Sequence, residues 1–416
     1  MLHIVVTVLV VTVLLNAEFS PWGMMGYGRL LVTPYLLTAS VFGYLIAYWF
    51  MLPAQWGTEE TASAVFFRQW LGVLLVLPLL GLLAWAPFRN VDSSDGRPSC
   101  VINAMAKEIV QSLDGRTWLV TDGPLDNHLL VAAHNMNLPL KLININKGRS
   151  SVYCSYLEGL FESPRMKNLV RVGISNLLLE WMKTDPDVCK KLAVLNKPDL
   201  WVAAGLTAVP SRLLFLGSKN SSEIDSANLL SNHHEFWERF KSISEYPFEE
   251  GAPLERWWRG FLRHTGMVAN NLGVYFEDLG RSEDAFAAYR ASREIDPENV
   301  SALLNMWGMV DNGLASDEDG SIKAAIGVLE KEQTQKFHIW SLSQYYGYVR
   351  LPEAFAQLGW TWAYSGQPGL GLEGLKKAKT LLPEDRQGRI KQLMAGIYLS
   401  QKQELKSAKI YADILK

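Results

Sequence analysis

The sequence predicts three successive parts: membrane helices, an α/β domain with a small parallel sheet, and an all-α solenoid of helical repeats. Three observations support this fold class. Nearly uncharged apolar runs fill much of residues 1–90, and short apolar runs alternate with helical stretches over residues 100–230. Near the C-terminus, two segments share the same residue offsets within a unit of about 34 residues, which is typical of a repeat protein.

The first part, residues 1–90, is predicted to be a transmembrane region with spans at about residues 2–15, 30–52 and 70–87. The second and third runs approach the roughly 20 apolar residues that a helix needs to cross a bilayer. Two alternatives remain open. The first run could be the core of a signal peptide, although no Lys or Arg precedes it, and the other two could be buried core helices. A span that begins at the first residue also suits a chain cut from a longer protein.

Charge gives a weak prediction of topology. Arg29, Arg89 and Arg97 would share one side of the membrane and Arg68 would lie on the other. The positive-inside rule therefore leans towards a cytoplasmic soluble part. The formal net charge of the whole chain is −2 and its basic residues are scattered, which argues against nucleic acid as a partner.

Cysteine usage limits the kinds of site that the chain could hold. Three cysteines lie far apart in the sequence: Cys100, Cys154 and Cys189. They form no C-x-x-C pair and no Cys/His spacing suited to zinc. We therefore expect neither a disulfide framework nor a structural metal, and we expect no cofactor.

The second part, residues 100–230, is predicted to be an α/β domain. The stretch from Thr117 to Ile145 has the length of a βαβ unit, whose two strands pair in parallel. The predicted strands are Thr117–Thr121, Leu140–Ile145, Leu200–Ala204 and Arg212–Leu216. The predicted helices are Val101–Leu113 and Asp126–Met136, with further helices within Tyr153–Phe161 and Asn168–Lys183.

Four polar residues follow the first predicted strand: Asp122, Asp126, Asn127 and His128. Because ligands of open parallel sheets bind beyond the carboxyl ends of the strands, these residues are candidates for a catalytic or ligand-binding site. The structural alternative, which we favour, is that Gly123 and Pro124 make a turn and Asp126 caps the following helix. Both interpretations remain open.

The order of elements around this cluster carries a loose resemblance. Membrane spans are followed by a helix, a strand that ends in Thr-Asp-Gly, an Asp-Asn pair and a second strand, LPLKLININ. This order resembles the junction in multi-spanning bacterial proteins related to protein O-mannosyltransferases, over about residues 107–146. The resemblance implies an extracytoplasmic soluble part and a sugar-transfer site in the membrane domain, carried by acids in early loops. The acids between the spans of this chain are Glu18, Glu59 and Glu60.

The third part, residues 266–416, carries a motif L-G-x-x-Y, then A-x-x-x-F, then P, which is matched twice. The first match comprises Leu272, Gly273, Phe276, Gly280, Ala285, Tyr289 and Pro297, and the second Leu358, Gly359, Trp362, Gly366, Leu375, Ala378 and Pro383. The pattern resembles that of tetratricopeptide repeats (TPR). Gly359 lies 86 residues after Gly273, so an intervening repeat carries roughly 18 extra residues, which we place in the polar run Asp311–Gly320.

The TPR resemblance implies a concave groove that is lined by the first helix of each repeat and holds peptides or partner proteins. On the matching positions, the groove would present Asn270, Val274, Glu277, Asp278, Trp360 and Tyr364. These positions lack the Lys and Arg of the family's carboxylate clamp, so we expect a basic or apolar partner segment. The alternative is that each of these side chains only packs or solvates the solenoid.

Residues 231–265 are predicted to form a helical connector rich in aromatic residues. Three tryptophans are expected to pack between the α/β domain and the solenoid: Trp237, Trp257 and Trp258. Three histidines lack a carboxylate or thiol at a spacing that a known metal site requires: His233, His234 and His264. We therefore predict no metal site in the connector.

These observations predict a membrane-anchored bacterial TPR scaffold for protein–protein interaction. The alternative is the C-terminal portion of a multi-spanning glycosyltransferase that uses a lipid-linked sugar, so enzymatic activity is left open, with a non-enzymatic role favoured. The expected partners are a protein or peptide in the TPR groove and the lipid bilayer. The expected location is the bacterial inner membrane, as a multi-pass protein. The side of the soluble part is unresolved, and the family resemblance slightly favours the extracytoplasmic side.

Overall fold

The computed structural model describes residues 2–14, 32–55, 62–89, 99–195, 198–219, 225–244, 253–332 and 339–414. The chain divides into two compact units. The smaller unit comprises Met1–Cys100 and Phe248–Trp257, and the larger unit comprises Val101–Pro247 and Trp258–Lys416.

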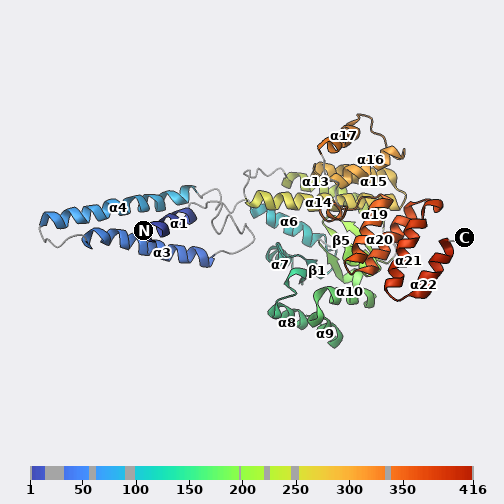
Figure 1. The fold of residues 1–416 in the computed structure, drawn as a ribbon, viewed down its shortest axis with the longest axis horizontal. Coiled ribbons are helices and arrows are strands. Elements are labelled where there is room, and N and C mark those ends of the chain that lie inside the picture. The colour runs from blue at the N-terminus through green and yellow to red at the C-terminus, as the bar shows by residue number, and fades with distance from the viewer. Residues whose placement is uncertain are drawn as a thin grey trace. The chain divides into compact units, whose positions relative to one another are not determined.

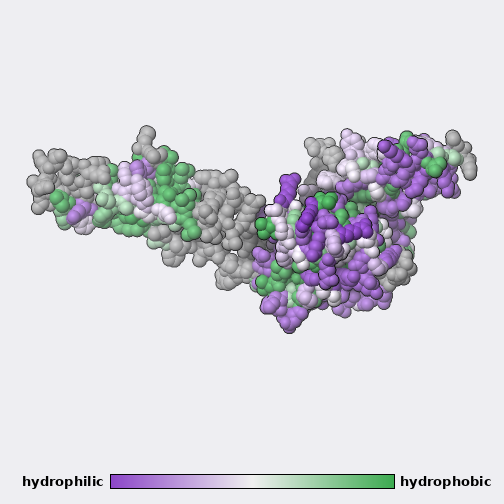
Figure 2. All heavy atoms as spheres, turned by 90° about the horizontal axis from the view of Figure 1, so that it is seen from below, coloured by the Kyte–Doolittle hydropathy of each residue, from purple (hydrophilic) through white to green (hydrophobic). Residues whose placement is uncertain are grey.

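The smaller unit is helical where it is described. Its helices within the first 89 residues are α1 (Leu2–Leu14), α3 (Val32–Met51), η1 (Leu52–Gln55) and α4 (Ala62–Arg89). Val10, Phe42, Leu45 and Leu79 form a small apolar core between α1, α3 and α4. Other apolar side chains of this unit are exposed, and Figure 2 shows broad green areas over its described atoms.

The prediction of membrane helices is wrong. Among the described residues, no helix combines the length and the apolar character that crossing a bilayer requires. The 13 residues of α1 reach only about 20 Å, against a hydrocarbon core of roughly 30 Å. Thr, Ser, Gly and Tyr residues dilute the apolar content of α3, and α4 includes Arg68 and Gln69. The predicted multi-pass location in the bacterial inner membrane is wrong with it, while Arg29 and Arg97 lie outside the described residues.

The larger unit contains a five-stranded sheet in the order β2-β1-β3-β5-β4. The strands are β1 (Trp118–Thr121), β2 (Lys141–Asn144), β3 (Leu192–Val194), β4 (Thr207–Ser211) and β5 (Leu214–Ser218). β1 pairs in parallel with β2 and β3, whereas β5 pairs antiparallel with both β3 and β4. The predicted parallel sheet is therefore wrong, and the sheet is mixed. Only Arg212 and Leu213 connect β4 to β5, and so short a connection allows only an antiparallel pair.

Helices surround the sheet (Figure 1). They are α6 (Ser99–Gln111), α7 (Asp126–Asn135), η2 (Ile145–Lys147), α8 (Ser151–Gly159), α9 (Pro164–Val172), α10 (Ile174–Thr184), α11 (Val188–Lys191) and α12 (Asp199–Ala203). The predicted strand Leu200–Ala204 is wrong, because this segment is α12. Trp201 on α12 is fully buried beneath Gly217, where an added Cβ would lie 2.5 Å from the indole ring.

The C-terminal half of the larger unit consists of helices, several of which pack side by side in chain order (Figure 1). They are α13 (Ser226–Ser244), α14 (Pro253–Asp278), α15 (Ser282–Ile295), α16 (Val300–Asp311), α17 (Ser321–Glu332), α18 (Ile339–Tyr345), α19 (Pro352–Tyr364), α20 (Pro368–Leu381), η4 (Glu384–Arg386), α21 (Gly388–Ser400) and α22 (Glu404–Ile414). The motif glycines Gly280 and Gly366 follow α14 and α19 with φ of +74° and +85°, a left-handed conformation that favours glycine.

The two motif matches coincide with two helical hairpins, α14/α15 and α19/α20. Gly273 faces the ring of Tyr289 so closely that no Cβ fits between them. At the equivalent Gly359, an added Cβ would lie 2.7 Å from the carbonyl oxygen of Gly371. The extra length of the intervening repeat was predicted at Asp311–Gly320, but that run holds only part of it. A further 19 residues, 333–351, separate α17 from α19.

Candidate partner-binding groove

The structure separates the predicted groove residues into two places. Asn270, Val274, Glu277 and Asp278 lie along α14, where Asn270 is fully buried and Val274 is 6% exposed. Trp360 and Tyr364 lie on α19 and are 52% and 87% exposed.

A segment of the chain itself covers the α14 residues. We name residues 346–350, which connect α18 to α19, the strap. The backbone N–H of Tyr348 donates to Asn271 Oδ1 at 2.8 Å. The carbonyl oxygen of Tyr348 accepts from Asn270 Nδ2 at 3.0 Å and from Asn305 Nδ2 at 2.9 Å. The centre of the strap is thus held by its main chain.

Asparagine side chains also hold both ends of the strap. Asn299 Nδ2 donates to the carbonyl oxygen of Tyr346 at 3.1 Å, and the N–H of Arg350 donates to Asn305 Oδ1 at 2.7 Å. Asn305 Nδ2 also donates to Asn270 Oδ1 at 2.9 Å, so the two amides fix each other's orientation. We name Asn270, Asn271, Asn299 and Asn305 the asparagine site. All four are at most 5% exposed.

The side chains of the strap complete the contact. Arg350 donates to Glu277 Oε1 at 2.6 Å and to Asp278 Oδ1 at 2.9 Å. Burial raises the pKa of the Glu277 carboxyl, and the Arg350 guanidinium opposes this shift. The Tyr348 hydroxyl donates to Asp199, and burial followed by the Asp199 charge raises the pKa of Tyr348 well above its usual value. The strap therefore contacts both α14 and α12.

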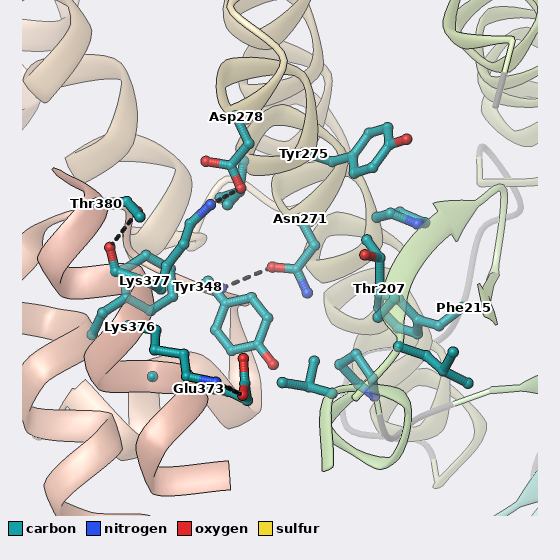
Figure 3. A pocket seen from close by; sticks show the side chains of 18 of the residues that line it. Thr207, Phe215, Asn271, Tyr275, Asp278, Tyr348, Glu373, Lys376, Lys377 and Thr380 are labelled. Carbon is teal, nitrogen blue, oxygen red and sulfur yellow. Dashed lines mark hydrogen bonds and ion pairs between the residues drawn. The ribbon is translucent and has the colours of Figure 1, made fainter. Parts of the chain in front are cut away.

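A pocket of about 450 Å³ lies beside the strap, between β4, α14, α19 and α20. Figure 3 shows Tyr348 in its middle, with Lys376 and Lys377 on one side and Thr207 and Phe215 on the opposite side. Both lysines are paired, Lys376 with Glu373 and Lys377 with Asp278. The polar wall of this pocket is therefore already neutralised.

A second pocket, of about 590 Å³, lies between α19 and α21. Its walls are Pro352, Glu353, Ala356, Gln357, Trp360, Leu382, Arg386, Arg389, Ile390 and Leu393. Arg386 on η4 and Arg389 on α21 are exposed and make no ion pair with a described residue, whereas Lys391 on α21 pairs with Asp413. An exposed indole, apolar side chains and two unpaired guanidinium groups therefore meet in one open groove.

The residues predicted after the first strand do not converge on one site. Asp126 is buried, and its carboxylate accepts from Thr121 Oγ1 at 2.6 Å and from Asn144 Nδ2 at 2.7 Å. It does not cap α7, because the N-cap residue is Leu125. Asn127 is exposed, Asp122 is partly buried, and His128 Nδ1 lies 3.0 Å from Asn103 Oδ1. Asp126 thus joins the ends of β1 and β2.

Two of the three histidines of the predicted connector, His233 and His264, contact the turn between β4 and β5. The N–H of Arg212, which has a φ of +55°, donates to His233 Nε2 at 3.0 Å. His264 Nε2 lies 2.9 Å from the carbonyl oxygen of Leu213. Burial lowers the pKa of His233 to about 4. Within the described ranges, no group of three or more His, Cys, Asp or Glu side chains could hold a metal ion.

The connector tryptophans differ in environment. Trp237 is 7% exposed and lies against the rings of His233 and His234. Trp258 is 4% exposed and stacks on Phe240 with ring centroids 5.7 Å apart. Trp257 is partly buried. The contact between Trp258 and Phe240 packs α14 against α13.

A comparison with profiles of known protein families gives no match, and no curated protein matches the chain in sequence. The described structure is mostly helical and is consistent with a repeat-type helical protein. The geometry of its grooves is therefore the basis for a functional proposal.

The asparagine site is the feature that sequence reasoning missed, apart from Asn270. A signal was present, because asparagine is a poor helix former and Asn270, Asn271 and Asn305 all stand within the predicted all-α solenoid. Buried asparagines in a helix need partners for their amide groups. The sequence did not reveal that those partners lie 77 or more residues away from Asn271 and Asn270 along the chain.

Proposed function

We propose that the C-terminal helices form a TPR-type scaffold that binds a segment of a partner protein and acts through binding alone. The observation that carries this proposal is the open groove between α19 and α21. Trp360, at 52% exposure, offers a large rigid apolar surface there, and such residues dominate binding energy at protein interfaces. The motif contacts at Gly273 and Gly359 support the relationship to tetratricopeptide repeats.

The sequence led us to expect a basic or apolar partner segment, whereas the charges of this groove favour a segment that is apolar and acidic. Arg386 and Arg389 are unpaired among the described residues, and Glu353 is the acid that lines the same pocket. The groove therefore carries a net positive charge. An apolar side chain packed on Trp360, next to one or more carboxylates, is the segment that would be complementary to it.

Site-specific photo-crosslinking in the native host tests the proposal. A photoreactive residue is placed at Gln357, which is exposed and lines the groove, and in a matched control at Leu405, which is 89% exposed on α22. We expect one discrete adduct from position 357, which Trp360→Ala abolishes, and no such adduct from position 405. Identical adduct patterns from the two positions would show that the groove is not a specific binding surface.

No described contact favours the alternative role in sugar transfer over binding. The acids expected to carry that chemistry, Glu18, Glu59 and Glu60, lie outside the described residues. One function is therefore proposed.

A further inference from the structure

The strap is held in the way that a protein holds a bound peptide. Four of its backbone groups pair with side-chain amides: the carbonyl of Tyr346, the N–H and carbonyl of Tyr348, and the N–H of Arg350. These groups belong to alternate residues, and the strap turns at Gly347 between the first two of them, where φ is +94°. Hydrogen bonds to the main chain bind a segment whatever its sequence, and the contacts of its side chains determine which sequence is preferred.

The asparagine site requires an occupant. Asn270 and Asn305 are 0% and 4% exposed, and each uses its amide both as donor and as acceptor. Buried amide groups without partners cost about 1–3 kcal/mol each. The folded protein therefore keeps a segment in this site, and the strap is the segment that its own chain supplies.

Three contacts define which residues the site accepts. Gly347 has a φ of +94°, and an added Cβ would lie 2.5 Å from Asn271 Oδ1, so this position requires glycine. The next position places a tyrosine hydroxyl against Asp199. Two residues further, an arginine meets the paired carboxylates of Glu277 and Asp278. Between the tyrosine and the arginine, Val349 is 1% exposed and packs against Leu342 and Ala354, so the required pattern is Gly-Tyr-x-Arg with an apolar residue at x.

We propose that the asparagine site is a peptide-recognition site that exchanges the strap for a Gly-Tyr-x-Arg segment of a partner protein. The acidic pair Glu277 and Asp278 selects the cationic residue of that segment by charge complementarity. The tethered strap competes at an effective concentration on the order of millimolar. A free peptide therefore binds the parent protein weakly, and it binds more tightly once the strap is weakened. This site is separate from the groove between α19 and α21.

The test uses a fluorescent peptide, SQYYGYVRLP, which copies residues 343–352, and the full chain as the protein. Gly347→Ala removes the strap from the site, because the new Cβ overlaps Asn271 and Asn270. Arg350→Gln weakens the strap more gently, because it leaves the backbone contacts intact. By fluorescence anisotropy, we expect the peptide to bind both variants, and Gly347→Ala at least about tenfold more tightly than the parent.

Two controls locate the binding. The peptide with Glu in place of its arginine should not bind, because it would face Glu277 and Asp278. Asn305→Ala, added to either strap variant, should abolish binding of the original peptide. If Gly347→Ala does not fold, the peptide affinity of Arg350→Gln, compared with that of the parent, decides whether the strap is exchangeable.

Three outcomes overturn the proposal: a folded strap variant that binds no better than the parent, binding that survives Asn305→Ala, or equal binding of the charge-reversed peptide. Any of these would identify the strap as a permanent connection between α18 and α19. None of them bears on the adduct expected at position 357, so a failure here is distinguishable from a failure of the scaffold proposal.

Discussion

The buried imidazole of His233 should make the larger unit lose stability as the pH falls. Burial lowers its pKa from the ordinary 6.5 to about 4. Below pH 6.5 the unfolded chain takes up a proton, whereas the folded chain stays neutral until about pH 4, so acid favours the unfolded state. Integration between the two pKa values gives a loss of about 2 kcal/mol at pH 5, relative to pH 7.5.

Because other groups also titrate in this range, the effect of His233 is isolated by comparison with His233→Gln. The amide oxygen of glutamine can accept the N–H of Arg212 as the imidazole does, but it does not titrate. Chemical unfolding curves of both proteins at pH 7.5 and pH 5 give the two losses in free energy. We expect the parent to lose about 2 kcal/mol more than His233→Gln. Equal losses in the two proteins would refute the reasoning.

Two further predictions concern packing and buried polar contacts. Asp126→Ala should lower the free energy of unfolding by about 2–5 kcal/mol, because the Asn144 amide and the Thr121 hydroxyl lose their buried acceptor. Asp126→Asn should lower it by only about 1 kcal/mol. Similar losses in the two variants, measured by thermal or chemical unfolding, would contradict these contacts. On α14, Gly273→Ala should destabilise by roughly 1–3 kcal/mol because its Cβ overlaps Tyr289, while Gly260→Ala, with open space around it, should stabilise by about 1 kcal/mol. Equal melting temperatures of the two alanine variants would contradict this packing.

Local sequence patterns predicted the elements whose stability is mainly local. The predicted strands Thr117–Thr121 and Leu140–Ile145 are confirmed as β1 and β2, and the helix Asp126–Met136 is confirmed as α7. The hairpins α14/α15 and α19/α20 also lie where the motif placed them. Hydrophobic periodicity and small-residue offsets determine these elements within one short stretch of chain.

Elements that depend on distant partners were not predictable in the same way. Leu200–Ala204 contains apolar residues that suit a strand, yet it is helical because Trp201 packs against Gly217 and its indole N–H donates to the carbonyl oxygen of Phe215. The helix predicted at 168–183 is divided at Gly173, whose φ of +149° interrupts it. In both cases tertiary packing or one backbone angle overrides the local pattern.

The predicted groove on α14 also combines a local part that the sequence predicted and a distant part that it did not. The motif register placed Asn270, Glu277 and Asp278 on one helix face, but the sequence carried no indication that the strap covers them. The strap lies about 70–80 residues further along the chain, outside the run Asp311–Gly320 in which the repeat spacing placed the extra residues. The position of the strap on α14 follows from the hydrogen bonds between its backbone and the asparagine side chains, which no sequence pattern indicates.

Hydrogen exchange at the backbone N–H groups of Tyr348 and Arg350 tests most directly whether asparagine side chains hold the strap. We predict that both groups are protected in the parent protein. In Asn305→Ala, the Arg350 N–H should exchange at least about tenfold faster, because its acceptor is gone, while the N–H of Leu272 within α14 keeps its protection. Unchanged protection of Arg350 in the variant would contradict the central claim that the asparagine site binds the strap through its main chain.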